Sequence, residues 1–283
     1  MLRSLTSAIS GLQNFQERID VIGNNIANIN TTGYKAARVN FEDSFSQTLR
    51  LSSPSTAGAS GASAMQIGTG VSTSTITNIQ TQGALARTGV NTDLALAGEG
   101  FFVVRDTGTN AEFATRAGDF RLDGNGYLVT NNGARVQGFS DAGLISRGDL
   151  KIDTTGLPAT SDPAASVVSF GVDGDGKINV NLSDGTQFVR GQVLLQKFND
   201  PQGLVKAGNN LYTNLGAAGP LATTAAPGSN GIGKIQAGAL ELANVDLANE
   251  FADMITAQRA FQATSKIVST SDEIMQELVN LKR

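Results

Sequence analysis

The sequence predicts an α+β protein, with long N- and C-terminal heptad helices packed as a coiled coil and a central antiparallel β-domain. Two observations carry this prediction. Apolar residues recur every seven positions at both ends of the chain, and glycine-containing turn signals divide the middle into short apolar runs. The predicted division is a helical core domain over 1–33 and 242–283, a flexible connecting segment over 34–67 and the β-domain over 68–241.

The N-terminal helix is expected to run from the first residue to about residue 33. Its two apolar rows, spaced by seven, are Leu5, Leu12, Ile19 and Ile26, and then Ala8, Phe15, Ile22 and Ile29. Its predicted polar face carries Gln13, Asn14, Gln16, Glu17 and Asp20. A period near 3.5 sustained over four heptads is typical of a helix that packs against other helices.

The end of this helix, "GNNIANINTTGYK", is rich in poor helix formers. The residues that we expect to control the turn or the register are Gly23, Asn24, Asn25, Asn28 and Gly33. In one interpretation the weakened helix folds only when partners cover its isoleucines, and the asparagines fix register by hydrogen bonding across a packed surface. In the other, residues 28–33 are a C-terminal cap and turn with Gly33 in the left-handed conformation. Both remain open.

The C-terminal helix is expected to begin at Leu247, with Asp246 as its N-cap and Glu250 in its first turn. Its apolar row spaced by seven is Leu247, Met254, Phe261, Val268 and Met275, and a second row is Ala260, Ile267, Ile274 and Leu281. A hairpin of the two helices leaves apolar rows in water, so we expect copies of the chain to cover them in a homopolymer. The predicted assembly interface is Leu5, Leu12, Phe15, Ile19, Ile22, Ile26, Leu247, Met254, Phe261, Val268, Met275 and Leu278.

The amino-acid composition argues against several classes of function. The chain has no Cys and no His, which removes the commonest metal ligands and the commonest general base, so no catalytic residue, metal or cofactor is predicted. A formal charge of −4 gives no electrostatic reason to bind nucleic acid. No apolar run is long enough for membrane insertion, and none near the start predicts a cleaved secretory signal.

The middle of the chain contains one acidic cluster, Asp173, Asp175 and Asp184. The stretch at Asp173 begins like a calcium loop, but Lys177 and Ile178 stand where a ligand and a glycine belong, so a hairpin turn is expected. The cluster is nevertheless the only candidate site for a rival class of function. In that class the chain is a secreted adhesin or a carboxylate-based hydrolase with helical dimerisation ends.

Three stretches resemble the bacterial flagellar rod and hook proteins. They are "ISGLQNFQERIDVIGNNIANINTTGYKAARVNFEDSFSQTL" near the start, "DLALAGEGFFVV" followed by "TRAGDFRLDGNGYLVT" in the middle, and "GALELANVDLANEFADMITAQRAFQATSKIVSTSDEIMQELVNLKR" at the end. They cover both ends and about half of the middle, in the order expected for that family. The ending and the overall length resemble the hook members more than the distal rod member.

The resemblance implies a structural subunit that assembles into a helical tube, with the terminal helices inside and the β-domain outside. It implies export through the flagellar type III apparatus without a cleaved signal, and a place in the flagellar basal body or hook, outside the cell. The implied partners are copies of the chain and neighbouring axial proteins: rod, hook cap and hook–filament junction. The Ser/Ala/Gly-rich stretch over 51–65 favours a hook, which is a flexible joint that transmits torque from rod to filament; a distal rod protein is the alternative.

In the free subunit, we expect the residues before about Thr32 and after about Val245 to be mobile, because their apolar rows lack partners. Limited proteolysis of the monomer should cut these ends first and leave the β-domain intact. Amide hydrogen exchange gives an independent measurement, and protection of both ends in a verified monomer would contradict this expectation.

Overall fold

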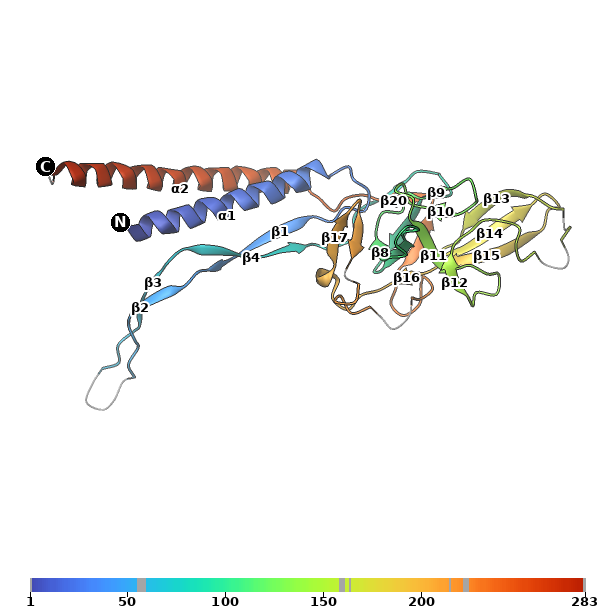
Figure 1. The fold of residues 1–283 in the computed structure, drawn as a ribbon, viewed down its shortest axis with the longest axis horizontal. Coiled ribbons are helices and arrows are strands. Elements are labelled where there is room, and N and C mark those ends of the chain that lie inside the picture. The colour runs from blue at the N-terminus through green and yellow to red at the C-terminus, as the bar shows by residue number, and fades with distance from the viewer. Residues whose placement is uncertain are drawn as a thin grey trace. The chain divides into compact units, whose positions relative to one another are not determined.

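The computed structural model describes residues 2–54, 60–157, 161–162, 164–213, 215–220 and 224–281. The chain forms two compact units, which Figure 1 shows in ribbon form. Unit 1 contains Met1–Ala27, Ala37–Ile79 and Val245–Arg283, and unit 2 contains Asn28–Ala36 and Gln80–Asn244. The chain therefore passes from one unit to the other four times.

Unit 1 contains two antiparallel helices, α1 (Leu2–Ala27) and α2 (Leu247–Leu281). Their direction follows from an ion pair between Arg18 and Asp253 and from a hydrogen bond between Asn25 and Glu250, since later residues of α1 meet earlier residues of α2. The helix α2 begins at the predicted residue. The Asp246 carboxylate caps it by accepting from the backbone N–H of Ala248 at 2.9 Å. This confirms paired terminal helices, while their supercoiling as a coiled coil stays a prediction.

The helix α1 ends six residues earlier than predicted, so Ile29 lies outside it. The Asn28 carbonyl accepts from the backbone N–H of Thr31 at 3.0 Å, which closes a turn in place of a further helical turn. Gly33 has a φ of +67°, the left-handed conformation expected there. A Cβ at this position would lie 2.6 Å from the backbone nitrogen of Ala117, so glycine is required sterically as well.

A long β-ribbon forms the rest of unit 1. Its strands are β1 (Ala37–Asp43), which pairs with β4 (Val71–Asn78), and β2 (Ser46–Arg50), which pairs with β3 (Met65–Gly68). The predicted division differs here, because it made 34–67 a flexible connection and began the β-domain at residue 68. Residues 55–59 of that connection lie outside the described residues. The flexibility of the segment stays a prediction, although β1, β2 and the first residues of β3 lie within it.

Unit 2 is an antiparallel β structure, and its described residues include a short 3-10 helix over Pro201–Gly203. Its strands are β5 (Leu85–Arg87), β6 (Leu94–Ala97), β7 (Phe101–Arg105), β8 (Glu112–Thr115), β9 (Arg121–Leu122), β10 (Leu128–Val129), β11 (Arg135–Phe139), β12 (Arg147–Asp149), β13 (Val167–Val172), β14 (Lys177–Leu182), β15 (Gln187–Val193), β16 (Leu195–Gln196), β17 (Val205–Gly208), β18 (Leu211–Thr213), β19 (Lys234–Ala237) and β20 (Ala239–Glu241). The main path of its largest described sheet is β13-β14-β15-β11-β7-β8-β18-β17. All described strand pairings are antiparallel, which confirms the predicted α+β class.

The strand β7 separates two apolar cores. Phe102 and Val104 point into the larger core with Leu96 and Ile178, whereas Phe101 lies on the opposite face with Phe198, in a smaller core that also contains Tyr212. Since successive side chains of a strand point to opposite faces, burial on both sides explains why β7 reads as an unbroken apolar run.

The predicted hairpin turns are present in unit 2. Residues 123–126 join β9 to β10, residues 173–176 join β13 to β14, and residues 183–186 join β14 to β15. At the Asp173 turn, the Asp173 carbonyl accepts from the N–H of Gly176 at 2.8 Å, and Gly176 has a φ of +77°. The stretch that resembled a calcium loop is therefore a tight turn.

The acidic cluster suggested by the sequence is not a single site. Asp173 and Asp175 lie at one end of β14 and Asp184 at the other, and six residues of extended strand span about 20 Å. Within the described part of the chain, no group of three or more acidic side chains is placed to hold a metal ion. A carboxylate-based active site built on these residues is therefore wrong.

Candidate assembly interface

The helix α1 is covered on one side by the ribbon of unit 1. Asn14 is buried there: its amide donates to the Val71 carbonyl at 2.9 Å, and its oxygen accepts from the Thr73 hydroxyl at 2.6 Å. Phe15 packs edge-on against Phe41 of β1, with 6.3 Å between the ring centroids. The prediction that Asn14 lies on the polar face was wrong, because β4 covers Asn14 and supplies hydrogen-bond partners for its side chain. The other residues predicted on that face, Gln13, Gln16, Glu17 and Asp20, are exposed.

The other side of α1 faces α2. The residues of α2 that this contact covers, at least in part, are Met254, Phe261 and Val268 from the predicted row, together with Ala257, Thr264 and Ser271. The second set consists of small residues and is also spaced by seven. Gly11 of α1 lies opposite it, where a Cβ would be 3.5 Å from the Thr264 methyl carbon. Small side chains on both helices allow the close approach.

The structure divides the predicted interface residues into two groups. The group that is buried or half-buried within unit 1 is Leu5, Leu12, Phe15, Ile19, Ile22, Ile26, Met254, Phe261 and Val268. The exposed group is Leu247, Met275 and Leu278. Contacts of either group with other subunits stay a prediction, but the first group already has partners inside its own chain.

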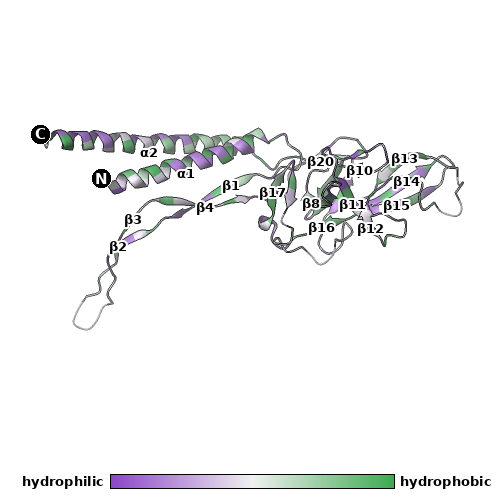
Figure 2. Ribbon diagram, in the orientation of Figure 1, coloured by the Kyte–Doolittle hydropathy of each residue, from purple (hydrophilic) through white to green (hydrophobic). Residues whose placement is uncertain are grey.

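Large apolar side chains remain exposed along α2, and we call them the uncovered α2 residues. They are Leu247, Phe251, Ile255, Ile267, Ile274, Met275, Leu278, Val279 and Leu281. Figure 2 shows hydrophobic and hydrophilic residues alternating along the whole helix. Near its C-terminal end, Met275 also lines an apolar hollow of about 440 Å³ with Leu5, Ile9 and Val268. A run of exposed apolar residues of this length is typical of a surface that binds protein.

The predicted turn and register residues have different surroundings. Asn25 is buried; its amide oxygen accepts from the N–H of Ala37 at 2.9 Å, and its nitrogen donates to the Ala37 carbonyl at 2.8 Å. A single side chain thus holds the first residue of β1 against α1. Gly23 is half-buried, and a Cβ at this position would meet no neighbouring side chain or strand within 4 Å. Asn24 is exposed, and the Asn28 carboxamide oxygen accepts from the Thr31 hydroxyl.

Asn25 also donates to the Glu250 carboxylate at 3.1 Å. Burial raises the pKa of Glu250, and the nearby carboxylates of Asp253 and Asp246 act in the same direction, while the hydrogen bond from Asn25 opposes them. Asn25 therefore joins α1, β1 and α2 within the subunit, and its role in setting their register stays a prediction.

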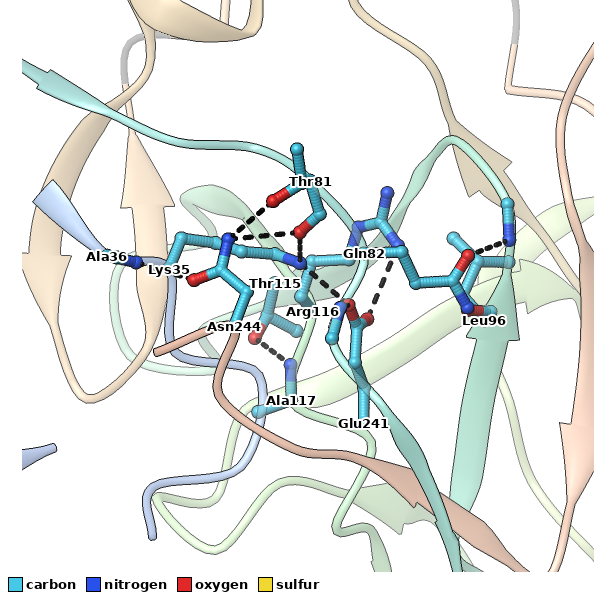
Figure 3. Close-up of polar contacts among 12 residues, drawn as sticks. Lys35, Ala36, Thr81, Gln82, Leu96, Thr115, Arg116, Ala117, Glu241 and Asn244 are labelled. Atoms are coloured by element: carbon cyan, nitrogen blue, oxygen red, sulfur yellow. Dashed lines mark hydrogen bonds and ion pairs between the residues drawn. The ribbon is translucent and has the colours of Figure 1, made fainter. Parts of the chain in front are cut away.

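Unit 2 contains a second polar cluster, shown in Figure 3. The Lys35 ammonium lies 2.6 Å from Oε1 of Glu241, and Nη1 of Arg116 lies 3.3 Å from Oε2 of the same carboxylate. All three side chains are at most 5 % exposed. Burial lowers the pKa of Lys35 and that of Arg116, and Glu241 opposes both shifts. Glu241 is thus the shared counter-charge of two buried cations.

The cluster extends to the chain segments at the edge of unit 2. The Asn244 carboxamide oxygen accepts from the N–H of Ala36 at 2.8 Å, and its nitrogen donates to the Thr81 hydroxyl at 2.9 Å. The Lys35 ammonium donates to the Thr81 carbonyl at 2.7 Å. The sequence alone does not predict this cluster of Lys35, Thr81, Glu241 and Asn244, because neither composition nor periodicity marks a lysine as buried.

Comparison with known proteins identifies the class. Residues 5–35 match the family described as "Flagella basal body rod protein", residues 95–180 match "Flagellar hook protein FlgE/F/G D1 domain", and residues 236–281 match "Flagellar basal body rod FlgEFG protein C-terminal". These regions contain α1, most of the large sheet and α2. The chain is therefore a structural subunit of the bacterial flagellum and not an enzyme.

Individual relatives of the chain belong to the same family as these matching models. The chain is 44 % identical to the flagellar basal-body rod protein FlgG of Bacillus subtilis over 283 residues, covering all of both chains. It is 33 % identical to FlgG of Borreliella burgdorferi over 287 residues, and 28 % identical to the flagellar hook protein FlgE of the same organism over 444 residues, with full coverage of both chains in each case. The chain belongs to the flagellar basal-body rod and hook protein family. Among its described residues, neither helix is long and apolar enough to cross a membrane.

Replacing Glu241 by Gln keeps its shape but leaves Lys35 and Arg116 without a counter-charge. We expect the free energy of unfolding of unit 2 to fall by roughly 3–5 kcal/mol, the usual cost of breaking a buried ion pair from one side. Urea unfolding followed by fluorescence or circular dichroism measures the change.

The matched control is Glu99→Gln, because Glu99 pairs with Lys197 at 2.6 Å but is 72 % exposed. That substitution should cost less than about 1 kcal/mol. Equal effects of the two substitutions would show that Glu241 has no special role in stability.

Proposed function

We propose that this chain is the distal rod protein of a bacterial flagellum, a structural subunit that polymerises into a rigid helical tube between the inner rod and the hook. The observation that carries the proposal is the alignment length. The chain matches the B. subtilis rod protein end to end over 283 residues, whereas the B. burgdorferi hook protein needs 444 aligned positions, of which this chain can fill at most 283. The hook relative therefore contains a large region with no counterpart here.

The sequence favoured the hook, chiefly because residues 51–65 offer little that could lock against a neighbour. The ribbon of unit 1 weakens that argument, because it exposes apolar residues that a neighbouring subunit could contact. Its exposed large apolar residues are Phe45, Leu49, Leu51, Met65, Ile67 and Ile76, and Phe45 is 89 % exposed. Contacts between such residues and neighbouring subunits would stiffen a tube, which supports a rod. The hook remains the alternative function.

We further propose that α1 and α2 form a coiled coil in the inner tube of the polymer, and that the uncovered α2 residues make contacts between subunits. Within unit 1, α1 already has partners on two sides, so α2 has the larger apolar surface left to bury. The partners would be copies of this chain, other rod proteins on one side and the hook on the other. Export of the unfolded chain through the flagellar type III apparatus, without a cleaved signal, is part of the same proposal.

Ile267→Asp and Ile274→Asp test this interface, because both isoleucines are exposed in the subunit. Each should raise the critical concentration for polymerisation at least about tenfold, since an unpaired charge buried between subunits costs several kcal/mol. Sedimentation measures the polymer, and the unfolding of the monomer should not change. Gln262→Asp places the same charge on an exposed polar position of α2 as a control. Normal polymerisation of both isoleucine variants would exclude these residues from the interface.

Electron microscopy of the polymer separates rod from hook. We expect straight tubes from the unmodified protein. The double variant Phe45→Ser, Leu51→Ser should still polymerise, but its tubes should bend more and have a persistence length several-fold shorter, because apolar contacts between neighbours are lost. Thr48→Ser, at an exposed position on the same ribbon, should leave the tubes straight. Curved, flexible tubes from the unmodified protein would return the assignment to the hook.

A further inference from the structure

We propose that Asn244, supported by the Lys35–Glu241 pair, is a torsional positioning residue. The chain passes between the two units at four places, which we call crossings. Asn244 holds three of these crossings together at the edge of unit 2, so that they transmit twist as one bundle. The three are the crossings next to Ala36, Thr81 and Asn244. The torque-carrying part of this inference rests on the proposed function, whereas the local grouping of the three segments does not.

The geometry of Asn244 suits this role. Its carboxamide accepts from Ala36 on one side and donates to both the hydroxyl and the carbonyl of Thr81 on the other, the latter at 3.2 Å. These partners lie 208 and 163 residues away in the sequence. An asparagine is suitable because it donates and accepts at once, while an aspartate could not donate to the Thr81 carbonyl.

The ion pair joins the same three segments a second time. Lys35 donates to the Thr81 carbonyl, and its partner Glu241 precedes Asn244 by three residues. The Glu241 carboxylate also accepts from the N–H of Gly83 at 2.9 Å, and the Glu241 carbonyl accepts from the N–H of Gly33 at 2.8 Å. The ion pair is buried but Asn244 is only half-buried, so the contribution of Asn244 comes from its hydrogen bonds more than from packing.

Simple mechanics explains why such cross-links would matter. Each residue of a chain has two soft dihedral angles, so a single extended strand resists pulling but turns easily about its own axis. Several strands that are hydrogen-bonded to one another cannot turn independently. A subunit that passes torque between its helical unit and its β unit therefore benefits from crossings that are cross-linked where they meet.

Hydrogen exchange in the monomer tests the local part. In Asn244→Ala, the amide of Ala36 should exchange about tenfold faster or more, because it loses its acceptor and the cluster loses two further hydrogen bonds. The amide of Val104, deep in the unit, is the internal reference and should not change. Asn131→Ala, which removes an exposed asparagine bonded to Asp119, should leave Ala36 protected. Unchanged exchange at Ala36 in Asn244→Ala would overturn the inference.

Torsional stiffness of the assembled tube tests the coupling, for example through the twist fluctuations of a bead attached to one end. Asn244→Ala and Asn244→Asp should polymerise normally but give tubes about twofold softer in twist, since one of the two sets of bonds between the strands is then weakened or lost while the Lys35–Glu241 set remains. Normal stiffness together with fast exchange at Ala36 would show that the grouping carries no torque.

Thr81→Val provides a milder variant in case both Asn244 variants fail to assemble. It removes only the hydroxyl acceptor and should reduce the torsional stiffness of the tube by a smaller amount. Unchanged stiffness would overturn the inference that the bonded crossings transmit torque. If the unmodified protein does not polymerise, the proposed function is wrong and the torsional part falls with it. The exchange experiment would then still decide whether Asn244 holds the three crossings.

Discussion

The interaction on which the rest of unit 2 depends is the buried carboxylate of Glu241. It neutralises Lys35 and Arg116, two cations that could not otherwise remain in a region of low polarity. Burial there also raises the pKa of Tyr212 to about 12. Because Lys35 and Glu241 come from opposite ends of the unit, their pairing brings together the segments by which the chain enters and leaves it. Asn244 can bond to both Thr81 and Ala36 because this pairing has placed them within reach.

The two helices of unit 1 differ in how far their side chains are buried within the subunit. The helix α1 lies between α2 and the ribbon, and even its buried asparagines find partners, with Asn14 on β4 and Asn25 on β1. The longer α2 has one covered side and many uncovered apolar residues. The apolar row of α1 is therefore covered largely within the subunit, whereas most of the unburied apolar surface of the two helices lies on α2. For a protein of the flagellar axis, this separates the residues that fold the subunit from those available to its neighbours.

The sequence predicts what depends on local spacing. Both helices, the N-cap at Asp246, the hairpin turns of unit 2 and the left-handed Gly33 follow from periodicity or from turn chemistry. The features that the sequence did not predict depend on partners far away along the chain. Asn14 looks like a surface residue until β4, more than fifty residues away, lies against it, and Lys35 looks solvated until Glu241 reaches it. The ribbon was missed because β2 and β3 are exposed throughout and flank a Ser/Ala/Gly-rich stretch, which was interpreted as a flexible connection.

The order of the strands along the chain has a consequence for how the protein is made and moved. The strands β5 and β6 find their partners in β20 and β19, which follow more than 130 residues later. A chain that leaves a ribosome or a narrow channel N-terminus first has neither of these partners, nor the counter-charge for Lys35, until almost the whole unit has emerged. The unit therefore cannot be completed until residues 234–241 are available, although the local hairpins of its large sheet need none of them.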